Sequence, residues 1–214
     1  MSARLAVLVS GGGRSLENLA EVIGRGELDA EIALVLSNRT DAYALQRAER
    51  LGLEAVVVPH REHADADAFS AAVFAEIEAR RCDLVVLAGF LRLLLLPSDW
   101  VGRVLNIHPA LLPAFGGKGY WGDRVHRAVL ERGVQFTGCT VHYVTNEYDA
   151  GPIVLQRCVA VRPDDTVERL AARVFEQEQL ALPEAIRLHL SGAVRLEGGR
   201  VVRAAQSSAA PLDS

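Results

Sequence analysis

The sequence predicts an α/β fold built on a doubly wound, mostly parallel sheet flanked by helices. One observation is that short apolar runs alternate with segments of helical period through the first half of the chain, as in repeated β-α units. A second is that these runs are almost uniformly apolar, as strands buried on both faces are. We expect an antiparallel part at the carboxyl-terminal side of the sheet, formed by residues 135–144 and 153–161.

The first half of the chain supplies the expected parallel strands. Helices follow from Ser15, at 42–51 and at 69–80, where apolar residues recur at helical spacing. Glycines close the first two helices. The strands are expected at residues 4–9, 31–37, 55–58, 84–88 and 104–107.

The second half adds helices at 123–132 and 166–190 and a small hairpin of residues 193–196 and 200–203. Asp165 and Glu168 form a capping-box pattern that opens the long last helix. We expect one domain over residues 1–203, with halves at 1–110 and 111–203. Residues 204–214 have the composition of a tail.

Composition favours a soluble, cytoplasmic protein. About half of the 214 residues are apolar, and the net charge of −4 provides no basic face for nucleic acid. The amino-terminal apolar run is too short for a signal-peptide core, and Gly89 and Arg92 interrupt the apolar stretch 84–96. We therefore expect no membrane partner. Three widely spaced cysteines indicate buried thiols in a reducing compartment. A monomer and a homodimer both remain open.

A glycine-rich turn joins the first strand to the first helix. Such a turn aims backbone N–H groups and the helix dipole at one point, which suits a phosphate. Leu16 occupies the third glycine place of the dinucleotide fingerprint, and the P-loop lysine is absent. A tight turn that needs positive φ is the alternative. We favour a phosphate cradle of neither standard type, formed by Gly12, Gly13, Arg14 and Ser15.

Polar residues at the end of strand 104–107 are the main candidates for chemistry. Asn106 and His108 stand where a doubly buried strand should be apolar, so they need a partner or a function. Ligands of such sheets bind beyond the carboxyl ends of the strands. Asn106 and His108 would therefore share one edge of the sheet with the glycine-rich turn.

Four further positions have a structural and a functional interpretation. His60 and His63 form either a solvated loop, which we favour, or part of a metal site that lacks a third ligand. His126 on its helix is either packed or catalytic. Asp149 is either a turn residue or a carboxylate beside His108. Glu178 falls on the apolar stripe of the last helix, so it is paired, fringed by solvent or facing a cleft.

An amide, an imidazole and a carboxylate suffice for acyl transfer without a protein nucleophile. The amide N–H binds a developing oxyanion, and the histidine moves the proton. A nearby carboxylate raises the proton affinity of the histidine. No Gly-x-Ser-x-Gly elbow supplies a covalent intermediate. The residues predict direct transfer between two bound substrates, with no metal.

Five runs of this sequence resemble those of the phosphoribosylglycinamide formyltransferase family over roughly residues 4–200. Their Asn-x-His-Pro and Asp-x-Gly motifs are specific to formyltransferases. The resemblance implies a Rossmann-like formyltransferase fold and transfer of a formyl group from 10-formyltetrahydrofolate, the co-substrate, to the amine of 5′-phosphoribosylglycinamide in purine synthesis. The five runs are SGGGRSLENL, DLVVLAGFLRLL, VLNIHPALLPAF, TGCTVHYV and EYDAGPIVLQ.

The resemblance also implies roles for individual residues. Asn106 stabilises the oxyanion, His108 is the general acid and base, and Asp149 keeps His108 protonated. Residues 12–15 hold the ribonucleotide phosphate, and Glu178 lies near its amine. The expected substrate-binding set is Gly12, Gly13, Arg14, Ser15, Pro109, Lys118 and Glu178. The expected folate-binding set is Leu91, Arg92, Leu93, Leu94, Asn106, Thr145, Asn146, Glu147 and Tyr148.

The sequence departs from the family pattern at four places, one of which is Ala150, which follows Asp149 in place of a second glycine. Ala66 replaces an expected arginine, and nearby Arg61 is its candidate substitute. Arg14 adds a charge to the phosphate loop. The glycine-rich insertion 116–122 carries Lys118, which we interpret as part of a lid.

Rival activities with the same triad are formyltetrahydrofolate hydrolase and methionyl-tRNA formyltransferase. The first usually carries an additional amino-terminal domain, and the second an additional carboxyl-terminal one. A non-catalytic nucleotide-binding module and a dehydrogenase are the rivals from other classes, and the broken fingerprint argues against both.

Overall fold

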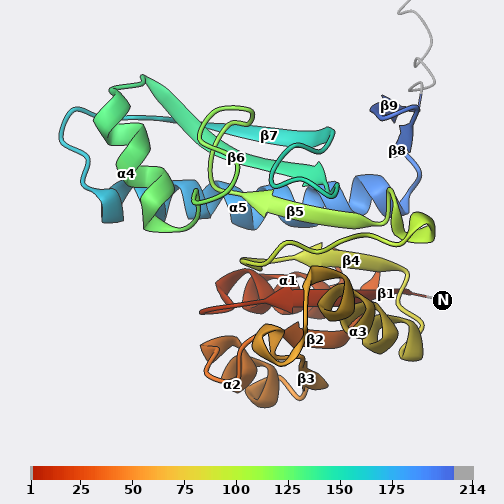
Figure 1. The fold of residues 1–214 in the computed structure, drawn as a ribbon. Coiled ribbons are helices and arrows are strands. Elements are labelled where there is room, and N and C mark those ends of the chain that lie inside the picture. The colour runs from red at the N-terminus through yellow and green to blue at the C-terminus, as the bar shows by residue number, and fades with distance from the viewer. Residues whose placement is uncertain (1, 205–214) are drawn as a thin grey trace, which may run out of the picture.

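The computed structural model describes residues 2–204, and the expected tail lies outside this range from residue 205 onward. Its main feature is a seven-stranded sheet in the order β3-β2-β1-β4-β5-β6-β7 (Figure 1). Strands β1 to β5 are parallel, whereas β6 and β7 are antiparallel to their neighbours. The doubly wound, mostly parallel sheet with an antiparallel carboxyl-terminal part is confirmed.

The strands lie close to their predicted places. Their bounds are β1 Ala3–Val9, β2 Ala30–Ser37, β3 Ala55–Val57, β4 Leu84–Leu87, β5 Val104–His108, β6 Phe136–Tyr143 and β7 Ile153–Ala160. A separate antiparallel hairpin consists of β8 Val194–Glu197 and β9 Arg200–Arg203.

Helices cover both faces of the sheet. Helices α1 (Arg14–Gly24), α2 (Tyr43–Arg50), α4 (Asp123–Arg132) and α5 (Val167–Leu190) contribute to one buried cluster, and α3 (Ala66–Ala79) contributes to the other. Alternate residues of β1 enter opposite clusters, since Leu5 and Val7 face α1 and α5 while Ala6 and Leu8 face α3. Burial on both faces explains the uniformly apolar strands. None of the helices within residues 2–204 is long and apolar enough to span a membrane.

Two helices begin differently from expectation. Helix α3 starts three residues early, because the Asp65 side chain accepts a hydrogen bond from the Ala68 N–H at 2.8 Å and caps it. The cap of α5 is Thr166, which accepts from the Arg169 N–H, so the capping box predicted at Asp165 is wrong. Asp165 instead accepts from the backbone N–H of Arg162 and pairs with Arg173.

The cysteines divide between core and surface. Cys82 and Cys139 are buried, as predicted, in opposite clusters of the core. Cys158 is exposed, so its prediction as a buried thiol is wrong. It lies on β7, which forms the edge of the sheet and is covered less completely than the central strands.

Candidate active site

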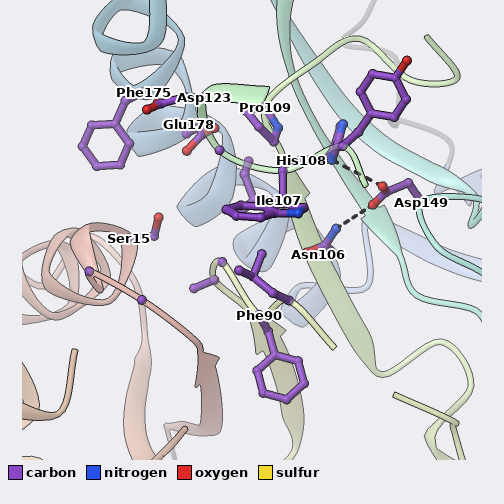
Figure 2. Close-up of a pocket in the computed structure, with 18 of the residues that line it drawn as sticks. Ser15, Phe90, Asn106, Ile107, His108, Pro109, Asp123, Asp149, Phe175 and Glu178 are labelled. Carbon is purple, nitrogen blue, oxygen red and sulfur yellow. Dashed lines mark hydrogen bonds and ion pairs between the residues drawn. The ribbon is translucent and has the colours of Figure 1, made fainter. Parts of the chain in front are cut away.

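A cavity of about 580 Å³ opens at the carboxyl edge of the parallel strands. It lies where the strand order reverses, between β1 and its neighbour β4. The loops after β1, β4 and β5 form its walls together with parts of α4 and α5. In Figure 2, Ser15 and Phe175 lie at one side of the cavity, and His108 and Asp149 lie at the opposite side.

The glycine-rich turn forms the first wall. Gly12, Gly13, Arg14 and Ser15 all line the cavity. Gly13 precedes α1 with a φ of 75°, and a Cβ there would stand 2.6 Å from the Cβ of Ala44. The tight turn with positive φ is confirmed at Gly13. The same turn places the start of α1 in the cavity wall, which is compatible with the phosphate cradle, and the cradle stays a prediction. The Arg14 guanidinium lies 4.0 Å over the Phe175 ring, which holds it at the cavity wall.

The three predicted catalytic side chains meet at the end of β5. The Nδ1 atom of His108 lies 3.5 Å from Oδ2 of Asp149, and Nδ2 of Asn106 lies 3.4 Å from Oδ1 of the same carboxylate (Figure 2). Asp149 has a φ of 54°, a left-handed conformation that aspartate tolerates better than most residues. Its turn geometry and its approach to His108 therefore occur together.

The loop after β5 forms hydrogen bonds with both His108 and Asp149. The Nε2 atom of His108 lies 2.8 Å from the carbonyl oxygen of Phe115, which can only accept a hydrogen bond. Nε2 therefore carries a proton, and in the neutral ring Nδ1 has the free lone pair that faces Asp149. The Gly117 N–H donates to Oδ2 of Asp149 at 2.8 Å.

Burial and neighbouring charges shift the pKa values of His108 and Asp149 in opposite directions. Burial lowers the pKa of His108 below its ordinary value, although Asp149 and the Phe115 carbonyl act to raise it. The effect of Asp149 has the expected sign, but the net shift opposes the expectation that His108 is kept protonated. Burial acts to raise the pKa of Asp149, yet the two nearby histidines and the Gly117 N–H hold it below its ordinary value. Asp149 is therefore ionised, and His108 is mainly neutral near pH 7.

Glu178 faces the cleft, one of the alternatives left open by its position on the apolar stripe. It lies on α5 in the cavity wall, beside Phe175 and Ala171. Burial raises its pKa to about 7, and the charge of Arg14 acts in the opposite direction. The carboxyl group therefore exchanges its proton near neutral pH.

The remaining predicted residues divide between the cavity wall and its surroundings. Pro109, Lys118, Leu91, Arg92 and Tyr148 line the cavity. Within the described residues, five members of the expected folate-binding set are outside this wall: Leu93, Leu94, Thr145, Asn146 and Glu147. Leu94 is buried in the core against α3, and Asn146 accepts from the Leu96 N–H at 2.8 Å.

His60 and Arg61 both line a second cavity beside the first. His60 contacts Asn38 and Arg92, and residues 2–204 contain no group of three side chains arranged to hold a metal ion. This second cavity, of about 750 Å³, shares Leu91, Arg92 and Trp121 with the first.

A family model described as formyl transferase matches residues 3–186. The chain belongs to the formyl transferase family. The crystal structure of glycinamide ribonucleotide transformylase 1 from Symbiobacterium toebii is 42% identical, with a TM-score of 0.87 and 94% of each chain covered. A chloroplastic phosphoribosylglycinamide formyltransferase of Arabidopsis thaliana is 39% identical over 86% of this chain and 64% of that protein.

Matching proteins also include much longer chains. The trifunctional purine biosynthetic protein adenosine-3 of Gallus gallus is 43% identical over 92% of this chain. The chain spans about a fifth of that relative, since the match covers 20% of its length.

Two residues of the site in this formyl transferase, His142 and Trp121, were not among those that the sequence predicted. His142 lies 2% exposed on β6, with Nε2 3.0 Å from Nδ2 of Asn106. Trp121 lines both cavities. His126, left open between packed and catalytic, lines the first cavity, and burial lowers its pKa. The sequence could have indicated His142, because it is a polar residue on a strand whose neighbouring residues are buried.

Proposed function

We propose that the chain transfers the formyl group of 10-formyltetrahydrofolate to the amine of 5′-phosphoribosylglycinamide in purine biosynthesis. The observation that carries the proposal is the approach of Asn106, His108 and Asp149 to one another, at the opposite side of one cavity from a helix start suited to phosphate. The names of the Symbiobacterium toebii and Arabidopsis thaliana relatives describe the same reaction class.

The reaction forms one C–N bond and breaks another. The amine of the ribonucleotide attacks the formyl carbon, and the carbonyl oxygen becomes an oxyanion that accepts a hydrogen bond from the Asn106 amide. Nδ1 of neutral His108 takes the proton that the amine must lose. The same proton then passes to N10 of the folate as the intermediate collapses, which releases tetrahydrofolate. Asp149 stabilises the imidazolium between these two steps.

Substrate binding divides along the cavity. The loop of residues 12–15 binds the phosphate through backbone N–H groups and the Arg14 charge, and Glu178 lies toward the amine. Leu91, Arg92, Asn106 and Tyr148 contact the folate, with Arg61 beyond them as the second cation. Lys118 and Pro109 close the ribonucleotide end. In this proposal residues 1–110 supply the phosphate loop, and 111–203 supply Asp149 and Glu178.

The deciding experiment is a formyl-transfer assay with both substrates, accompanied by Asn106→Ala and His108→Ala. We expect tetrahydrofolate to form only when the ribonucleotide is present, and each variant to lose about 10²-fold or more in kcat. Formate release that proceeds equally without the ribonucleotide would identify a hydrolase instead. Formylation of methionyl-tRNA in place of the ribonucleotide would identify the other rival.

A further inference from the structure

Asn106 has a polar neighbour across the sheet that the catalytic triad does not include. The antiparallel register of β5 and β6 places His142 directly opposite Asn106, so both side chains emerge on the same face. The two nitrogens, Nδ2 of Asn106 and Nε2 of His142, lie 3.0 Å apart. His142 is 2% exposed, so bulk water does not compete for this contact.

The backbone determines which nitrogen of His142 carries the proton. Nδ1 lies 2.9 Å from the carbonyl oxygen of Tyr143, which can only accept. Nδ1 is therefore the donor, and Nε2 of the neutral ring can only accept, so Asn106 must donate. Gly151 leaves room for this arrangement. A Cβ at Gly151 would lie 1.7 Å from the Tyr143 oxygen and 3.2 Å from Nδ1 of His142.

Two acceptors then specify the orientation of the Asn106 amide. Nε2 of His142 and Oδ1 of Asp149 lie 3.0 Å and 3.4 Å from the same amide nitrogen. A flipped amide would direct its oxygen at an imidazole lone pair and at a carboxylate, which is unfavourable for both contacts. The NH₂ group is therefore turned toward Asp149 and the reacting centre.

An alternative arrangement has His142 donating from Nε2 to Asp149. That arrangement leaves two donors facing each other across the 3.0 Å contact with Asn106. It also relies on a 3.7 Å separation from Oδ1 of Asp149, which is too long for a hydrogen bond. The distances favour the contact with Asn106.

We propose that His142 is a positioning residue: it accepts one Asn106 N–H, so that the other N–H, whose contact with Asp149 is only 3.4 Å, is the one that donates to the oxyanion. The role rests on the proposed formyl transfer, because that reaction creates the oxyanion. His142 acts through Asn106 and does not itself exchange a proton with either substrate.

Kinetics of three variants test the role. His142→Phe keeps an aromatic ring and removes the acceptor, so kcat should fall about tenfold, the effect of one net hydrogen bond, with both KM values within about twofold. His142→Gln restores an acceptor near Nε2 and should recover most of the loss. His189→Phe is the matched control. This histidine contacts the Tyr143 hydroxyl at 2.8 Å and lies outside the cavity wall within the described residues, so kcat should not change.

A double-mutant cycle tests whether the effect passes through Asn106. In an Asn106→Ala background, His142→Phe should cost nothing further, because the amide that it orients is gone. The pH dependence of kcat should keep its position in His142→Phe, because His108 still exchanges the proton. An undiminished tenfold loss in the Asn106→Ala background, or a shifted pH profile, would overturn the proposal.

Nuclear magnetic resonance of the unmutated protein provides a measurement independent of activity. The ¹⁵N shift of His142 Nε2 should be that of an unprotonated imidazole nitrogen, and a scalar coupling should join it to Nδ2 of Asn106. A protonated Nε2 would overturn the positioning role even if the enzyme is active. If the coupling is present but no formyl transfer occurs, the proposed function is wrong. The positioning role of His142 in that reaction is then wrong too, although the hydrogen bond between His142 and Asn106 is confirmed.

Discussion

At the scale of single residues, the site depends on which ring nitrogen of His108 and of His142 donates a hydrogen bond to a backbone carbonyl. The Phe115 carbonyl fixes the Nε2 proton of His108, and the Tyr143 carbonyl fixes the Nδ1 proton of His142. The two rings therefore present a lone pair toward the centre of the site from Nδ1 and Nε2, respectively. The first lone pair can take a proton from an attacking amine, and the second can orient Asn106.

Asp149→Asn tests the carboxylate beside His108. We expect kcat to fall roughly 10²-fold or more, because the imidazolium loses its stabilising charge. Asp149 raises the pKa of His108 against the larger effect of burial. Removing the carboxylate should therefore shift the acid limb of kcat against pH to still lower values.

The matched control for this prediction is Asp99→Asn, which changes an exposed carboxyl outside the cavity wall of the described residues. It should leave rate and pH profile unchanged. A near-normal kcat in Asp149→Asn across the pH range would reduce Asp149 to a turn residue.

Glu178→Gln tests the buried carboxyl through stability. The pKa of Glu178 is raised from 4.5 to about 7 in the folded protein, so folded Glu178 holds a proton that the unfolded chain releases between these values. Unfolding then becomes easier as pH rises through this window. Relative to the glutamine variant, wild type should lose Tm from about pH 4.5 to pH 7 and no further above it. A constant Tm difference across this range would contradict the assignment.

At the scale of elements, the loops at the carboxyl edge form one connected unit. The Ser10 N–H donates to the Gly89 carbonyl at 3.0 Å, which joins the loops after β1 and β4. The Ser10 hydroxyl accepts from the Leu91 N–H at 2.8 Å and donates to Oδ1 of Asn38, which follows β2. Hydrogen bonds therefore link the glycine-rich turn to the residues proposed to contact the folate.

Gly13→Ala tests the turn that begins α1. The substitution adds a Cβ 2.6 Å from the Cβ of Ala44 and places alanine at a φ of 75°. We expect a loss of about 2 kcal/mol or more in the free energy of unfolding, measured with denaturant. Gly11→Ala is the matched control in the same turn, since no atom lies within 4 Å of its added Cβ. It should change stability by about 0.5 kcal/mol or less, and equal losses in both variants would contradict the steric account.

At the scale of the whole molecule, one sheet separates two apolar clusters, and its edge strands are less protected than its centre. The central strands are buried on both faces, whereas β7 alternates buried and exposed positions. The three cysteines sample these environments: one lies in each cluster and one on the edge strand.

The reactivity of the three thiols therefore measures whether the buried clusters on the two faces of the sheet are closed to solvent. Burial raises the pKa of Cys82, and that of Cys139 to about 12, so neither should form the reactive thiolate. A thiol reagent should modify Cys158 alone in the native protein and all three cysteines after unfolding. Cys158→Ser should abolish the native reaction. Modification of a second thiol without unfolding would show that one face of the sheet opens.

Local sequence patterns were enough to predict the order of strands and helices and the main candidates for chemistry. Apolar periodicity is a local property, so the parallel β-α units could be predicted within a few residues. Asn106 and His108 were visible because amide and imidazole groups are unusual on a doubly buried strand. The glycine-rich turn was visible because glycine marks backbone that other residues avoid.

The tertiary structure alone decided how these candidates are coupled. The partnership of Asn106 with His142 depends on the register of two strands separated by 27 residues of chain, which no local pattern specifies. The net pKa shift of His108 depends on burial by distant segments, which outweighs the carboxylate that the sequence could suggest. Leu94 belongs to the leucine run predicted to contact folate, yet packing against α3 removes it from the cavity. Register and desolvation arise from contacts between remote segments, so only the folded chain fixes them.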